Sequence, residues 1–190
     1  MAFVLVEAGA AAEAHQQKKI SRLCIFGGSA STSAVNMKGF RERLRELGYI
    51  EGQNITIESR FFDAKFERLP ALAAELVALN CDVIVTEGNG PALAAKNATK
   101  TIPVVMAFGA DAVRTGVVAD LARPGGNVTG LTSIQAELSG KRLGLLKEVV
   151  PKLSWAAVIW SAEVADAVFA LKDTEPVARH LGEGIPSLPV

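Results

Sequence analysis

Residues 81–108, CDVIVTEGNGPALAAKNATKTIPVVMAF, determine the fold that we expect for this chain. Residues 82–86 form an apolar run that predicts a buried strand, and Gly88-Asn89-Gly90 predicts the turn after it. Pro91 then opens a predicted helix, at a position where its missing N–H is tolerated. A second apolar run, residues 103–108, predicts the next strand. A strand, a helix and a strand in this order indicate a parallel pair joined by a right-handed crossover.

The same alternation extends outward from this stretch in both directions. Further strands are predicted at residues 20–26, 54–61 and 127–131, and helices at residues 37–47, 69–79, 116–123 and 136–150. Apolar strands that are each followed by a helix are typical of a parallel sheet covered on both faces, so the sequence predicts a doubly wound α/β fold. We expect the strand order 2-1-3-4-5, because residues 54–61 alternate in polarity as an edge strand does. A Rossmann order is the open alternative.

The strand and helix pattern restarts near Trp155. A strand is predicted at residues 155–160 and a helix at residues 164–181, and residues 185–190 would begin another strand. One strand and one helix leave an unpaired edge and an apolar face, so this part is expected to be an incomplete second lobe that promotes self-association. The sequence therefore predicts a disordered tail or signal-peptide remnant at residues 1–19, an amino-terminal lobe at residues 20–151 and the start of a second lobe at residues 152–190.

Composition excludes several classes of protein. Twenty basic residues balance twenty acidic ones, so the chain lacks the positive charge that nucleic-acid binding requires. Two cysteines and two histidines without a C-x-x-C pattern do not predict a metal site. Cys24 and Cys81 lie in or beside apolar runs, which favours buried free thiols over a disulfide or a nucleophile.

The first residues leave two interpretations open. Residues 2–14, AFVLVEAGAAAEA, are apolar and end in an Ala-x-Ala pattern that a signal peptidase could cleave. They lack a basic leader, and Glu7 interrupts the apolar run. The segment is either the remnant of an export signal or a tail without a role, and no run in the chain is long enough to span a bilayer.

Three long stretches carry a family resemblance. They are RELGYIEGQNITIESRF (residues 45–61), FERLPALAAELVALNCDVIVTEGNGPALAAKNATKTIPVV (residues 66–105) and TGVVADLARPGGNVTGLTSIQAELSGKRLGLLKEVVP (residues 115–151). From about residue 22 to residue 160 the chain resembles ABC-transporter substrate-binding proteins related to tryptophan/tyrosine-type uptake binding proteins. It departs from the family pattern at Glu87, where a small hydroxyl residue or glycine is usual, and at Arg114, where glycine is common.

The resemblance implies both a fold and a function. The family has the type I periplasmic binding protein fold, in which two α/β lobes hold a ligand between them. It captures a small solute, with an amino acid as the family-level expectation, in the periplasm or elsewhere outside the cytoplasmic membrane. The solute then passes to an ABC permease in the membrane. We therefore expect a binding protein without catalytic residues, cofactor, metal or nucleic-acid partner.

Three loops are candidates for the ligand site, because ligands of open α/β sheets bind beyond the carboxyl ends of the strands. The first loop contains Gly28, Ser29 and Ser31, whose hydroxyls and N–H groups at a helix start could bind a ligand carboxylate. Simple capping of the helix by these hydroxyls is the alternative.

The second and third loops add polar and aromatic candidates. The second contains Thr86, Glu87, Gly88 and Asn89, where glycine lets a ligand approach the backbone and Glu87 could pair with a ligand amine. Glu87 as a solvated surface carboxylate is the alternative. The third loop contains Phe108 and Asp111. Phe108 could stack on an aromatic ligand or belong to the core, and Asp111 could accept from an amine or hold neighbouring backbone N–H groups.

Two other functions stay open. A nucleotide- or flavin-dependent α/β enzyme would need a phosphate-binding motif or a Ser-His-Asp set, and neither is found in the sequence. The effector-sensing domain of a regulator would need a basic helix-turn-helix, which is absent before residue 20.

Overall fold

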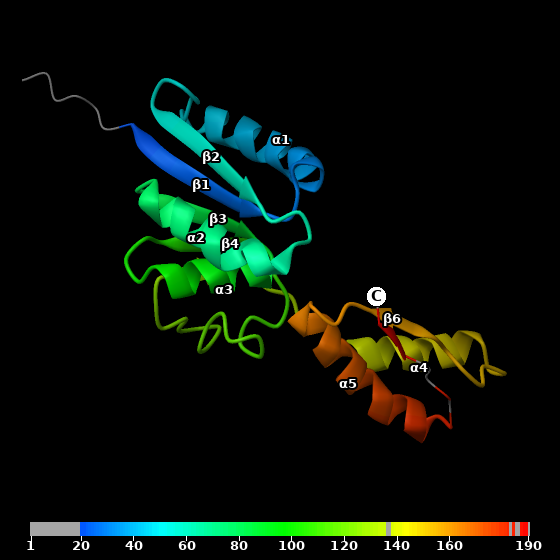
Figure 1. Cartoon of the computed structure of the whole chain (residues 1–190). Coiled ribbons are helices and arrows are strands. Elements are labelled where there is room, and N and C mark those ends of the chain that lie inside the picture. Colours follow the sequence, from blue (N-terminus) through cyan, green and yellow to red (C-terminus); the bar gives the residue numbers. More distant parts are fainter. Residues whose placement is uncertain (1–19, 136–137, 183, 185–186, 190) are drawn as a thin grey trace, which may run out of the picture.

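A five-stranded parallel sheet forms the larger part of the molecule (Figure 1). Its strands are β1 (Ser21–Gly27), β2 (Ile55–Phe61), β3 (Val83–Glu87), β4 (Val104–Phe108) and β5 (Val128–Gly130). The computed structural model describes residues 20–135, 138–182, 184 and 187–189, so the tail predicted at residues 1–19 lies outside it. The order β2-β1-β3-β4-β5 confirms the prediction, and β2 is an edge strand.

Helices cover both faces of this sheet (Figure 1). Helix α1 (Ala30–Glu46) packs on one face, where Leu23, Ile25, Met37 and Ile55 are buried together. The short 3-10 helix η1 (Phe66–Arg68), α2 (Leu69–Ala78) and α3 (Asn89–Ala98) lie on the other face. The alternating directions of the strand side chains divide the apolar residues between these two cores. We call the sheet with α1, α2 and α3 the first unit.

Cys24 and Cys81 form a disulfide, so the prediction of free thiols was wrong. Cys24 lies within β1 and Cys81 just before β3, and both side chains are buried in the core under α2. Parallel pairing of β1 with β3 brings their Cα atoms to 5.9 Å, although 57 positions separate them in sequence. Sequence patterns could not show this proximity, because it depends on the register of two strands that are not consecutive.

Residues 116–123 form turns and bends, and the helix predicted there is absent. Gly116 has a φ of +78°, which interrupts a helical path at the first position. The Asp120 Oδ1 accepts hydrogen bonds from the backbone N–H groups of Ala122 (2.8 Å) and Arg123 (2.9 Å). A short aspartate side chain that binds nearby backbone in this way favours a turn over a helix.

Gly130 ends β5 at a point of very close backbone approach. Its φ is +141°, and a Cβ atom there would lie 2.6 Å from the backbone nitrogen of Met106 in β4. Met106 and Gly130 are also register partners in the β4–β5 ladder. Only glycine fits this position without moving one of the two strands.

The remaining elements form a smaller second unit, which we define as α4 (Ser139–Val149), β6 (Val158–Trp160), α5 (Ala165–His180) and β7 (Ser187–Pro189). β6 and β7 lie within the segments predicted as strands, residues 155–160 and 185–190. They form a two-stranded parallel sheet, so β6 is not the unpaired strand that the sequence led us to expect. Gly140 of α4 lies against α5, where an added Cβ atom would be 2.7 Å from Val177 Cγ2. Because α4 packs on α5 (Figure 1), we propose a domain boundary between β5 and α4 in place of the one expected after residue 151.

Arg114 connects the two units. It lies in the turn after β4, and its guanidinium donates to both carboxylate oxygens of Asp173 on α5, at 2.5 Å and 3.3 Å. The same guanidinium lies 4.4 Å from the centre of the Phe169 ring. An ion pair combined with a cation–π contact holds α5 beside the first unit.

Candidate functional site

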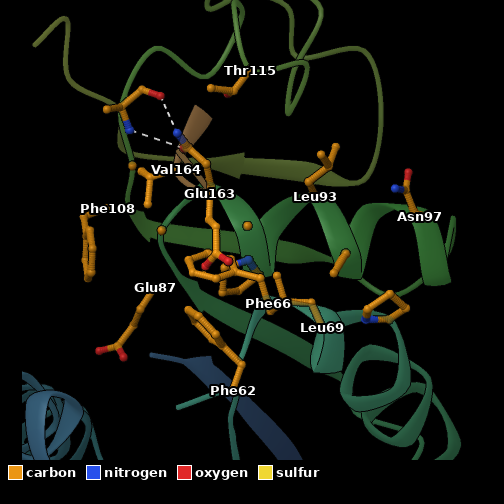
Figure 2. A pocket seen from close by; sticks show the side chains of 18 of the residues that line it. Phe62, Phe66, Leu69, Glu87, Leu93, Asn97, Phe108, Thr115, Glu163 and Val164 are labelled. Carbon is orange, nitrogen blue, oxygen red and sulfur yellow. Dashed lines mark hydrogen bonds between the residues drawn. The ribbon is translucent and has the colours of Figure 1, made fainter. Parts of the chain in front are cut away.

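A pocket of about 630 Å³ opens beyond the carboxyl ends of β3 and β4 (Figure 2). The first unit supplies most of its wall from the ends of these strands, the segment after β2 and the start of α3. Glu163 and Val164, which precede α5 in the second unit, complete the wall. The pocket therefore lies where the strand-end rule predicts, between the two units.

Glu87, Gly88, Asn89 and Phe108 line this pocket, as their positions at the ends of β3 and β4 lead one to expect. Three phenylalanines, Phe62, Phe66 and Phe108, contribute to its apolar surface together with aliphatic side chains such as Leu69 and Leu93 (Figure 2). The rings of Phe62 and Phe66 are tilted by 55° with their centres 5.0 Å apart. Phe108 is 51% exposed. The alternative interpretation, in which Phe108 belongs to the core, therefore does not hold.

Glu87 is held in place at one edge of the pocket. Its Oε2 accepts a hydrogen bond from the hydroxyl of Ser33, which lies in the first turns of α1 and is 1% exposed. A Cβ atom at Gly27 would overlap the Glu87 carboxylate, so the glycine at the end of β1 makes room for this side chain. Glu87 is thus a fixed and half-buried group, and the alternative of a freely solvated carboxylate does not agree with these contacts.

Asn89 joins the second and third loops. Its Nδ2 donates to the carbonyl of Ala110 (2.6 Å), and its Oδ1 accepts from the N–H of the same residue (3.3 Å; Figure 2, dashed lines). The backbone of Gly88 also donates to the carbonyl of Phe108 (2.9 Å). Both polar atoms of the Asn89 amide are therefore bound to the backbone of Ala110, so Asn89 holds the wall in shape. Its predicted contact with a ligand stays a prediction.

Gly28, Ser29 and Ser31 lie at the start of α1 and do not line the pocket. Ser29 caps the helix, because its Oγ accepts from the N–H of Thr32 at 3.2 Å. The hydroxyls of Ser31 and Thr32 lie 3.1 Å and 2.8 Å from that oxygen. These contacts show that the loop caps α1, which was the alternative interpretation of its hydroxyl groups.

Thr86 and Asp111 are buried, at 0% and 7% exposure, and neither lines the pocket. Thr86 alternates with Glu87 along β3 and points into the core instead. The backbone of Asp111 is tied into its loop, since its N–H donates to Ser133 (2.8 Å) and its carbonyl accepts from Thr115 (2.9 Å). Their place in a ligand site stays a prediction, and the structure puts both side chains in the interior rather than on the pocket wall.

Sequence reasoning missed several residues of the wall, among them Phe62, Phe66, Gln135 and Glu163. They follow β2 and β5 or precede α5, and no local motif marks them. Phe62 does come directly after a parallel strand, and the strand-end rule applied to β2 would have found it. Among the described residues, no cluster of three or more His, Cys, Asp or Glu side chains could hold a metal ion.

Comparison with known proteins identifies the family. A family model described as ABC transporter substrate binding protein matches residues 28–185. The chain belongs to this family. A tyrosine-binding protein from Clostridioides difficile (strain R20291) is a relative of this chain, 36% identical over 142 residues, which cover 75% of the chain and 41% of the relative.

Solved structures share the same fold. A conserved domain protein from Vibrio cholerae has a TM-score of 0.79 with 26% identity, covering 90% of this chain and 58% of its own. An ABC domain from Streptococcus pneumoniae, in complex with L-Trp, has a TM-score of 0.76 with 24% identity, covering 90% of this chain and 57% of its own. The family resemblance and the type I periplasmic binding protein fold predicted from the sequence are thereby confirmed. The chain spans roughly half the length of these relatives.

Proposed function

We propose that this chain is the solute-binding component of an ABC-type importer and that it captures a small solute, such as an aromatic amino acid, in the pocket between its two units. The observation that carries the proposal is the composition of the pocket wall, in which residues at the ends of β3 and β4 face Glu163 and Val164 of the second unit. Membership of a family of substrate-binding proteins supports binding rather than catalysis. The name of the tyrosine-binding relative supports an aromatic solute.

The pocket has a partner for each part of such a solute. The rings of Phe62, Phe66 and Phe108 would pack on its aromatic group. For a solute that has a carboxylate, the start of α3 is the position available to it, because the first N–H groups of a helix lack intrahelical partners. Glu87 or Glu163 would accept hydrogen bonds from its amine. A solute that contacts both units binds the closed arrangement more tightly and so shifts the population toward it.

We also propose that the protein works outside the cytoplasmic membrane and delivers its solute to a permease in that membrane. The Cys24–Cys81 disulfide supports this location, because disulfides persist in oxidising compartments and are rare in the cytosol. Among the described residues, no helix is both long and apolar enough to cross a membrane.

Substitution of Phe108 by alanine tests the position of the site. We expect Phe108→Ala to weaken binding of L-tyrosine or L-tryptophan by roughly tenfold, because about half of this ring is available to a solute. The unfolding midpoint should change little. Isothermal titration calorimetry measures the first quantity and thermal unfolding the second. Leu121→Ala, which removes another exposed apolar side chain away from the pocket, is the control, and equal effects of the two variants would contradict the proposed site.

The β6–β7 sheet leads us to propose self-association as well. Trp155 and Ile159 are 63% and 70% exposed on or beside β6, which is unusual for large apolar side chains. Contact between two copies would remove them from water. We expect multi-angle light scattering to show a mass that rises with concentration and that falls back to the monomer in Ile159→Lys. A constant monomer mass at high concentration would be evidence against this contact.

A further inference from the structure

We propose that the pocket prefers a cationic aromatic amine without a free carboxylate, an arylalkylamine, to the corresponding zwitterionic amino acid. The inference rests on the solute-binding function proposed above and names the class of solute. It follows from the charges on the pocket wall and from the contacts that fix them.

Among the described residues that line the pocket, the charged ones are the carboxylates Glu87 and Glu163, and none is a lysine, an arginine or a histidine. Within the described part of the chain, no Lys or Arg nitrogen lies within 4.0 Å of either carboxylate. An ammonium group entering the pocket would therefore meet negative charge that the protein leaves uncompensated, and a ligand carboxylate would be repelled by the same charge.

The carboxylate of Glu87 lies beside the start of α1, where the hydroxyl of Ser33 donates a hydrogen bond to Glu87 Oε2. Gly27 gives this carboxylate the room that a side chain would take. A ligand carboxylate near the start of α1 would therefore lie beside the negative charge of Glu87 and be repelled by it.

The start of α3 is the other position for an anion, and its attraction is limited. The amide of Asn89 is bound to Ala110 and cannot turn toward a ligand without breaking two hydrogen bonds. Pro91 contributes no N–H group. The remaining effect of the helix corresponds to about half a positive charge, against two full negative charges on the wall. The balance favours a solute with a net positive charge.

The apolar part of the wall suits an aromatic body that carries an ammonium group. Figure 2 shows Phe62, Phe66 and Phe108 around the same opening as Glu87 and Glu163. An aromatic ring of the ligand can pack on these faces, and an ammonium group near them gains a further cation–π attraction. The two kinds of contact together define an arylalkylamine rather than a small inorganic cation.

Calorimetry with four matched compounds tests this preference on the intact chain. Tyramine has the amine and no carboxylate, L-tyrosinamide has an uncharged amide in its place, L-tyrosine has both charges, and 3-(4-hydroxyphenyl)propionate has only the carboxylate. At pH 7 we expect tyramine and L-tyrosinamide to bind at least roughly tenfold more tightly than L-tyrosine, and the propionate not to bind measurably. In high salt the affinities of the amines and of L-tyrosine should differ less, because salt screens exposed charges.

Two variants connect the preference to Glu87. Glu87→Gln keeps the size of the side chain and an acceptor for the Ser33 hydroxyl. It should weaken tyramine binding roughly tenfold and so reduce the difference in affinity between tyramine and L-tyrosine. Glu42→Gln on the exposed side of α1 removes the same charge away from the pocket and should leave both affinities unchanged.

The results separate failure of the inference from failure of the proposed function. Equal or tighter binding of L-tyrosine would overturn the amine preference and leave the solute-binding function in place. An unchanged affinity of Glu87→Gln for tyramine would overturn it as well. Binding of none of the four compounds would overturn the aromatic solute proposed for this pocket, and the inference with it.

Discussion

Gly130→Ala is expected to lower the free energy of unfolding by more than about 3 kcal/mol, enough to unfold much of the population of a marginally stable protein. Two effects act together at this position. The φ of +141° is strongly unfavourable for a residue with a side chain, and the new Cβ atom would lie 2.6 Å from the backbone nitrogen of Met106. Met106 is itself 2% exposed in the core, so β4 cannot move away without disturbing its neighbours.

Gly126→Ala is the matched control for this substitution. Gly126 is four positions earlier in the same segment, has no positive φ and has no atom within 4 Å of an added Cβ. It should be neutral or slightly stabilising, because alanine restricts the unfolded chain. Urea unfolding followed by circular dichroism measures both variants. Similar unfolding midpoints for the two would show that β5 does not approach β4 as closely as the structure indicates.

Reduction of the Cys24–Cys81 disulfide is expected to lower the free energy of unfolding by about 2 to 4 kcal/mol. The bond links positions that are 57 residues apart, and it therefore removes many conformations from the unfolded chain. Both cysteines are buried in the core between β1, β3 and α2, so reduction also leaves two polarisable thiols to be packed there. Urea unfolding with and without dithiothreitol, after oxidative purification, measures the difference.

A double variant provides the control for this experiment. Cys24→Ala/Cys81→Ala should unfold at the same urea concentration with and without the reductant, at or below the midpoint of the reduced protein. Titration of thiols in urea supplies an independent readout. Two reactive thiols in protein that has never met a reductant would mean that the bond does not form.

Local patterns in the sequence predicted the fold well where a single segment determines the outcome. The apolar runs at residues 20–26, 82–86 and 103–108 became β1, β3 and β4, and the alternation at residues 54–61 became the edge strand β2. The helix predicted at residues 116–123 failed, because Gly116 and the side chain of Asp120 favour turns. In that segment the positive φ of Gly116 and the two hydrogen bonds of Asp120 outweighed a weak helical pattern.

Features that depend on the pairing of distant segments could not be predicted in the same way. The disulfide requires the register of β1 with β3, and the apolar pocket wall requires Phe62 and Phe66 to meet Phe108. The strand-end rule selected Glu87 and Phe108, which line the pocket, but it could not tell that Thr86 points into the core. The rule fixes the edge of the sheet and leaves open which of two successive side chains faces the ligand.

The contact of Arg114 with Asp173 and Phe169 affects how much a solute must contribute on entering the pocket. Arg114 and Asp173 do not line the pocket themselves. A rotation that separates the two walls would have to break their ion pair, so the contact favours the closed arrangement before a solute enters. Less of the binding free energy of a small solute is then needed to order the two walls, and more of it contributes to affinity and selectivity.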